Sequence, residues 1–188
     1  MSQRDALWEE NERLLMRLAA LAGELTAEDY RADHPDLAGQ SVGTHLRHAL
    51  EHYQAFLRGL AKGRIDYADR PREAALEQDP ALAAERVDRI RAELQTAVRE
   101  APEELWLVPE LSERRAGQGG TLPSGFDREL AFLASHTVHH MALIRLLLAE
   151  RGIRLEASFG VATATLRDGG EPARKADQAK GESLPCAG

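Results

Sequence analysis

The sequence predicts an all-α protein folded as a four-helix bundle. Apolar residues recur at three- and four-residue spacing, the period of one helix face, in four segments: 3–25, 41–61, 80–101 and 125–151. Two long connections join these amphipathic segments, an arrangement found in helix bundles. Leucine, alanine, glutamate and arginine are plentiful, and only 5% of the residues are aromatic, a composition that favours helices.

The length of 188 residues suits one domain. We expect this domain to span residues 1–167 and to be followed by a disordered tail, 168–188. From Gly169 onward the only large apolar residue is Leu184, too little to build a packed core.

Composition also narrows the expected partners and location. The net charge of −7 disfavours nucleic acid and anionic membranes as partners, and we expect no membrane span because no apolar run reaches the required length. The N-terminus lacks secretory signal character. The single cysteine, Cys186, permits no internal disulfide, so a cytoplasmic location is expected.

The first helix is expected over 3–25, with Ser2 as its cap and acidic residues in its first turns, which suits the helix dipole. The segment 26–40 contains proline and glycine and reads as a loop. His34 lies in this loop, and we expect it to be solvated.

The second helix is expected over 41–61, because Ser41 is a good N-cap and Gly63 ends the pattern. This helix carries three histidines within roughly 60° of one another at helical spacing: His45, His48 and His52. His45 and His52 lie nearer the apolar stripe, and His48 lies toward its polar edge.

Asp79 followed by Pro80 marks the start of the third helix, 80–101. In the charged loop before it, we expect Asp66, Arg70 and Arg72 to form salt bridges with each other rather than to face a pocket.

The stretch 102–123 is expected to be irregular. Residues 105–111 can form an extended segment, which Pro109 would restrict to the edge of a sheet. The glycine-rich part that follows reads as a flexible turn region.

The fourth helix, 125–151, can be capped by Ser124 or Asp127 and ends at a glycine. His136 and His140 lie roughly 40° and one turn apart on it, so both imidazoles can aim at one ion. His139 falls on the far edge of the stripe and ranks below them. After this helix we expect a short strand or turn and a docking segment.

Six of the seven histidines therefore lie on two helices, three on each. Two ligands from the fourth helix and one from the second would leave a coordination position open, as in catalytic metal sites. Imidazole suits zinc, nickel, iron or copper. On periodicity alone, His45 or His52 is the favoured ligand from the second helix. The alternative without metal is a polar histidine network.

Two segments resemble the DinB-like superfamily of four-helix proteins: SVGTHLRHALEHYQAFLRGL, 41–60, and RELAFLASHTVHHMALIRLLL, 128–148. The later FGVATATLR is also similar to segments of some members, so the resemblance covers most of 1–167. It implies an up-down-down-up bundle, often a homodimer, with a divalent metal on three histidines. The implied ligands are His48, seven residues after Ser41, together with His136 and His140. Three further histidines would then either hydrogen-bond the ligands or form an alternative ligand set: His45, His52 and His139.

The resemblance implies a metal-dependent enzyme that transfers a low-molecular-weight thiol or hydrolyses a small molecule. The metal would lower the pKa of a bound water or thiol. Three arginines could hold an anionic substrate: Arg47, Arg70 and Arg72. Glu129, two turns before His136, could accept a hydrogen bond or act as a base, but we expect it to be an exposed first-turn acid. No catalytic residue is assigned.

The competing hypothesis is a non-catalytic metal-binding or stress-response module whose bundle faces bind a partner. Such a site should be closed by a fourth protein ligand, for which His52 or His139 is available.

Overall fold

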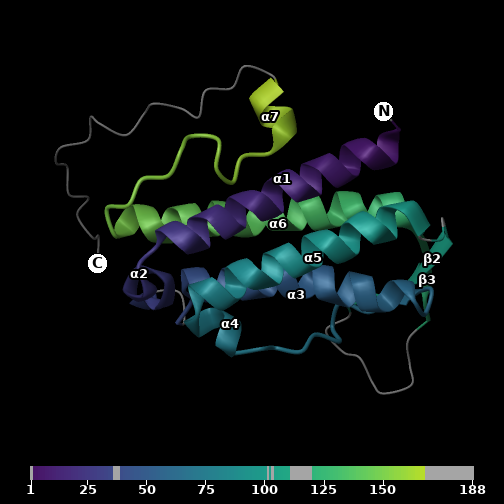
Figure 1. Cartoon of the computed structure of the whole chain (residues 1–188), viewed down its shortest axis with the longest axis horizontal. Helices are drawn as coiled ribbons and strands as arrows, with labels where there is room; N and C mark the ends of the chain where they lie inside the picture. The colour runs from purple at the N-terminus through teal and green to yellow at the C-terminus, as the bar shows by residue number, and fades with distance from the viewer. Residues whose placement is uncertain (1, 36–38, 101, 103, 111–119, 168–188) are drawn as a thin grey trace, which may run out of the picture.

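The computed structural model describes residues 2–35, 39–100, 102, 104–110 and 120–167. Four long helices form the bundle: α1 (Gln3–Glu24), α3 (Val42–Leu60), α5 (Pro80–Glu100) and α6 (Phe126–Glu150). α3 and α5 run in one direction and α1 and α6 in the other, as Figure 1 shows. The predicted up-down-down-up bundle is confirmed. The predicted tail, 168–188, lies outside the described residues.

Local capping starts three of these helices as expected. The Ser2 hydroxyl accepts a hydrogen bond from the Asp5 amide at 3.1 Å, and the Ser2 amide donates to the Asp5 carboxylate. Ser41 caps α3. The Asp79 carboxylate accepts from two amides in the first turn of α5. Each cap satisfies amides that have no partner within the helix.

The cap expected for α6 is wrong. Gly125 occupies the N-cap position and provides no side-chain hydrogen bond. Ser124 instead hydrogen-bonds the Glu129 side chain, and Asp127 accepts from Arg4 of α1 at 2.8 Å. Ser124 is therefore engaged by a side chain of the same helix and Asp127 by a side chain of α1, so neither caps α6.

The connection after α1 contains a short helix, α2 (Ala27–Arg31), capped by Thr26. The expectation that His34 is solvated is wrong, because its ring is half-buried and contacts the Glu150 carboxylate at the end of α6. A second short helix, α4 (Ala75–Gln78), precedes α5, and α7 (Thr163–Arg167) follows α6.

A three-stranded sheet at one end of the bundle was not expected. Its order is β1 (Arg64–Ile65), β2 (Glu104–Leu107) and β3 (Leu122–Gly125), with β2 parallel to β1 and antiparallel to β3. The prediction of an edge strand is wrong, since β2 is central. Pro109 lies beyond its end and interrupts no ladder.

The core runs along the bundle axis, and leucine is its commonest residue, with aromatic rings such as Phe56 and Phe126 among the others. Among the described residues, one helix, α6, is long and apolar enough to cross a membrane by length and composition alone. It packs against α1 and α3 as a core helix, and core helices meet the same criterion.

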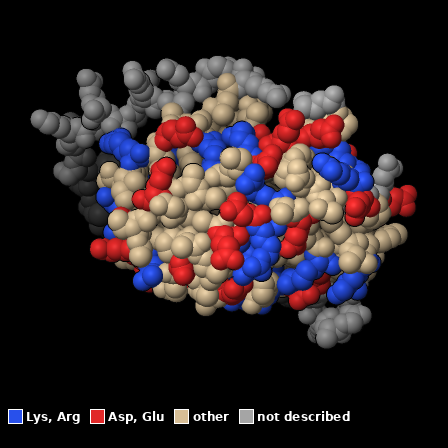
Figure 2. Space-filling view, viewed as in Figure 1, with Lys and Arg blue, Asp and Glu red and all other residues tan. Residues whose placement is uncertain are grey.

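Acidic and basic side chains alternate over the face shown in Figure 2. Ion pairs between neighbouring elements account for part of this pattern. Arg91 of α5 pairs with Glu12 of α1 at 2.8 Å, and Arg86 of α5 pairs with Glu73 at 2.6 Å.

Candidate metal centre

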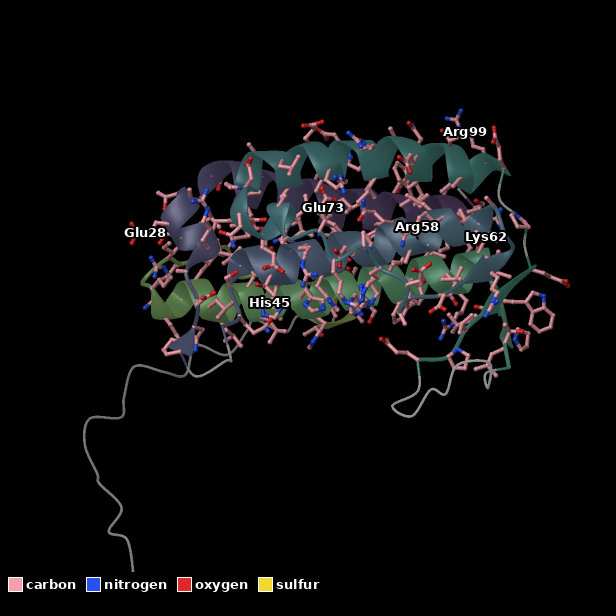
Figure 3. All side chains as sticks on the ribbon, turned by 90° about the horizontal axis from the view of Figure 1, so that it is seen from below. Glu28, His45, Arg58, Lys62, Glu73 and Arg99 are labelled. Carbon is pink, nitrogen blue, oxygen red and sulfur yellow. The ribbon has the colours of Figure 1, made fainter. Side chains whose placement is uncertain are left out.

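The histidines meet where α3 and α6 run side by side, and Figure 3 labels His45 at this seam. Three of them form a compact group: His48 from α3 and His136 and His140 from α6. One ligand nitrogen of each lies within 4.8 Å of the others, and the ring centroids are 4.5 to 5.2 Å apart. His140 is buried and the other two are half-buried. This cluster could hold a metal ion.

The chemistry of the three side chains fits an ion. Burial, more than any other cause, lowers the pKa of His48 and of His136 to about 4 and that of His140 to about 2. The imidazoles are therefore neutral near pH 7, and neutral imidazole is the form that binds metals. Nε2 of His136 is buried and has no hydrogen-bond partner among the described residues. A buried polar atom without a partner costs about 1–3 kcal/mol, and a bound ion would remove this cost.

His45 lies behind His140. Their two Nδ1 atoms are 3.0 Å apart, so one of them must carry the proton. This contact occupies Nδ1 of His140 and leaves its Nε2 for an ion. Metal-bound histidines usually donate their other N–H to such a partner, which fixes the ring orientation. In this arrangement His45 would orient His140 toward a bound ion and would not bind the ion itself.

His52 has both ring nitrogens engaged. Its Nδ1 lies 2.8 Å from the His48 carbonyl oxygen, which can only accept, so Nδ1 carries the proton. The unprotonated Nε2 accepts from Nη1 of Arg70 at 3.0 Å. Burial lowers the pKa of His52 to about 3, in agreement with a neutral ring. The helical wheel favours His52 as a ligand, but neither of its nitrogens is free in this structure.

His139 is exposed, and its ring meets that of His140 edge-on at 5.1 Å. Among the described contacts it makes no hydrogen bond to the cluster. Neither His139 nor His52 is therefore placed to close the centre as a fourth ligand.

The three arginines proposed to hold a substrate differ in their contacts with the histidines. Arg47 forms ion pairs with Glu51 and Glu77, at 3.3 and 2.6 Å. Arg72 is exposed, and none of its described contacts reaches the histidines. Arg70 alone hydrogen-bonds a histidine of this group. The expected salt bridges among the loop residues are not formed by these two arginines, which pair with no described carboxylate.

A sequence model of the DinB superfamily matches residues 10–144, more than half of the chain. The chain belongs to the DinB superfamily. The matched region contains α3 and most of α6, with all three clustered histidines. No curated protein and no solved structure gives a significant match to the chain.

Glu129 of this DinB protein is not the exposed acid that we expected, because its side chain is fully buried. Its carboxylate accepts from the Tyr67 hydroxyl at 2.8 Å, from the Ser124 hydroxyl and from Arg128. The Tyr67 ring stacks on His52 at 5.4 Å. Glu129 thus holds Tyr67 in place against the ring of His52. Its position three residues after Phe126, on the apolar stripe, was the sequence signal for burial. No local pattern identified Tyr67.

Proposed function

We propose that this DinB-superfamily protein is a metal-dependent enzyme that transfers a low-molecular-weight thiol to an electrophile or hydrolyses a small molecule. The observation that carries the proposal is the buried Nε2 of His136, without a hydrogen-bond partner and next to two other neutral imidazoles. A purely structural network normally pairs its buried polar atoms, and this one does not.

In this proposal His48, His136 and His140 hold zinc, nickel or iron. Three protein ligands leave a position for water or substrate. A divalent metal at such a site lowers the pKa of a bound water or thiol and so supplies a nucleophile at neutral pH.

The chain's own side chains would prepare this centre. His45 keeps the His140 ring in one orientation through the 3.0 Å contact between their Nδ1 atoms. Glu129 and Tyr67 anchor the loop that carries Arg70. A homodimer and a thiol cosubstrate, which the resemblance to the superfamily implies, belong to the same proposal.

The first test is metal content by elemental analysis of untagged protein, for wild type and for His48→Ala, His136→Ala and His140→Ala. We expect about one ion per chain in wild type and loss of the ion in each variant, because a three-ligand site does not survive removal of one ligand. His34→Ala is the control, since this histidine pairs with Glu150 away from the cluster.

The metal-loaded protein is then assayed with low-molecular-weight thiols and an electrophile, by the disappearance of free thiol, and with small esters and amides. Metal without either activity would support the non-catalytic module. Metal retained in His48→Ala but lost in His52→Ala would overturn the ligand set. No metal in wild type after reconstitution would overturn the proposal as a whole.

A further inference from the structure

We infer that Arg70, held in place by His52, forms an anion subsite beside the three-histidine centre, and that the substrate places a carboxylate group there. This inference rests on the proposed function above, because it assigns a substrate class to the same site. It is carried by the contacts of Arg70 and by the charge balance of its surroundings.

Arg70 is a half-buried cation without a counter-ion. No described carboxylate lies within salt-bridge distance of its guanidinium group, and its described hydrogen bond is to the neutral ring of His52. Buried or partly buried charges are normally paired. The guanidinium group lies next to the centre, since the centroid of the His52 ring that it binds is 3.9 Å from that of His136 and 4.5 Å from that of His48.

The way in which Arg70 is held leaves its charge available. Nη1 donates to Nε2 of His52, whose other nitrogen is engaged by the His48 carbonyl. A carboxylate in place of His52 would hold the guanidinium equally well but would cancel its charge. Nε is enclosed without a partner, whereas Nη2 has no described partner and is not enclosed. The planar guanidinium group suits carboxylate recognition.

The two described carboxylates that are buried, one on α3 and one on α6, already accept hydrogen bonds from other groups. Glu51 is buried and accepts from Arg47 and from the Glu73 amide. Glu129 accepts from Tyr67, Ser124 and Arg128, as described above. A divalent ion on three neutral imidazoles next to a guanidinium group would therefore face uncompensated repulsion, which an anionic ligand from solution would relieve.

The observations favour a carboxylate over a phosphate. Phosphate sites usually assemble several N–H donors, from a helix N-terminus or from an arginine cluster. Here the guanidinium group of Arg70 pairs with no described carboxylate, and one of its amino groups is accessible and has no described partner. A singly charged carboxylate matches this donor set.

The test is a titration of the full-length protein with acetate, followed by NMR through the histidine ring resonances, in the metal-free and in the zinc-loaded form. We expect Arg70→Gln to raise the Kd for acetate by roughly tenfold or more in the zinc-loaded form, because a charged hydrogen bond is lost. The matched control is Arg64→Gln, the same charge change at an exposed position on β1, which should stay within about twofold of wild type. Zinc stoichiometry is measured in every variant and should not change.

The positioning role of His52 is tested with a conservative pair. His52→Gln keeps a hydrogen-bond acceptor for Arg70, and His52→Leu removes it. We expect acetate affinity close to wild type in the first variant and the weak affinity of Arg70→Gln in the second, with zinc retained in both. Zinc lost in both variants would make His52 a ligand and overturn its positioning role.

The outcomes separate this inference from the proposed function. If no form of the protein binds zinc but acetate still binds the metal-free protein in an Arg70-dependent way, the proposed function fails and the anion subsite stands. If zinc binds and acetate has the same Kd in wild type and Arg70→Gln, or does not bind at all, the subsite is wrong. Inorganic phosphate bound in preference to acetate would overturn the carboxylate assignment.

Discussion

Helices α3 and α6 contribute side chains to two polar clusters, which differ in whether every buried side-chain atom has a hydrogen-bond partner. On the side toward α1, the Tyr53 hydroxyl donates to Asn11 at 2.8 Å and lies 3.0 Å from the Thr137 hydroxyl. Asn11 in turn donates to the carbonyls of Leu7 and Leu130. These side chains are fully buried, and each has a protein partner.

The second cluster is formed by the histidines of the candidate metal centre, two of which directly precede members of the first cluster in the sequence. His52 precedes Tyr53 and His136 precedes Thr137, so the side chains point about 100° away from the first cluster. Here Nε2 of His136 has no hydrogen-bond partner among the residues that the structure describes. The comparison teaches that α3 and α6 satisfy every buried side chain of the first cluster but not those of the second. We call the histidine cluster around His136 the open cluster, and it is the candidate site. The closed cluster consists of Asn11, Tyr53 and Thr137 and stabilises the bundle.

The largest effect is expected in the closed cluster. Asn11→Ala should lower the free energy of unfolding by about 3 kcal/mol, because it removes the buried hydrogen bonds of Asn11 to Tyr53, Leu7 and Leu130 and leaves a cavity. Urea denaturation of the metal-free protein measures this change. Glu9→Ala, at an exposed position of the same helix, is the control. A loss below about 1 kcal/mol would contradict the structural role of the closed cluster.

The second prediction concerns metal at the open cluster. Zinc at about 100 times its Kd should raise the free energy of unfolding of wild type by about 2.7 kcal/mol, and a chelator should reverse this gain. Thermal unfolding with and without zinc measures the effect. His136→Leu should show no gain, whereas Asn11→Ala should show the full gain because its cluster is separate. An equal gain in His136→Leu would place the ion elsewhere.

A smaller effect is expected from pH, because these side chains are partly screened by solvent. Burial holds the pKa of His48 and His136 at about 4, against an ordinary value of 6.5. Between these values the unfolded chain binds protons that the folded chain does not. The metal-free protein should therefore lose stability as the pH falls through this window. Urea denaturation at several pH values tests this, and a shallower dependence is expected for His136→Leu. A flat profile in wild type would contradict the burial of neutral rings.

His45→Leu should weaken zinc binding by roughly tenfold, because His140 loses the partner that orients it. Competition with a chelating dye measures the Kd. The exposed neighbour His139, changed to leucine, should alter the Kd by less than about twofold. If both variants weaken binding equally, the 3.0 Å contact does not orient the ligand.

The smallest effect is expected when the open cluster is closed with an apolar side chain. In the metal-free protein, His136→Leu should change the free energy of unfolding by less than about 1 kcal/mol, since it removes a buried atom that has no partner. A loss as large as that of Asn11→Ala would show that the histidines form a structural network. It would also remove the distinction between the two clusters.

The four helices could be predicted from sequence because their determinants are local. The apolar period and the caps Ser2, Ser41 and Asp79 act within a few residues of each helix start. The pair His136 and His140 was also predictable, since one turn of helix brings the two rings to the same side.

Other features depend on contacts between residues distant in sequence. The sheet pairs Arg64 with Trp106, and the burial of Glu129 depends on the Tyr67 hydroxyl, which comes from another loop. No local period encodes such pairings, so the sheet and the buried carboxylate were missed.

The choice among the α3 histidines shows the same division. The sequence by itself determined that His45, His48 and His52 share one side of a helix, because helical geometry follows from spacing alone. Helical periodicity did not select the one that joins the α6 pair, and only the resemblance pointed to His48. The tertiary structure brings His48 to the pair, because it places His140 beside His45 and Arg70 on His52. A ring nitrogen can serve an ion only if no neighbour occupies it, and the neighbours are a property of the tertiary structure.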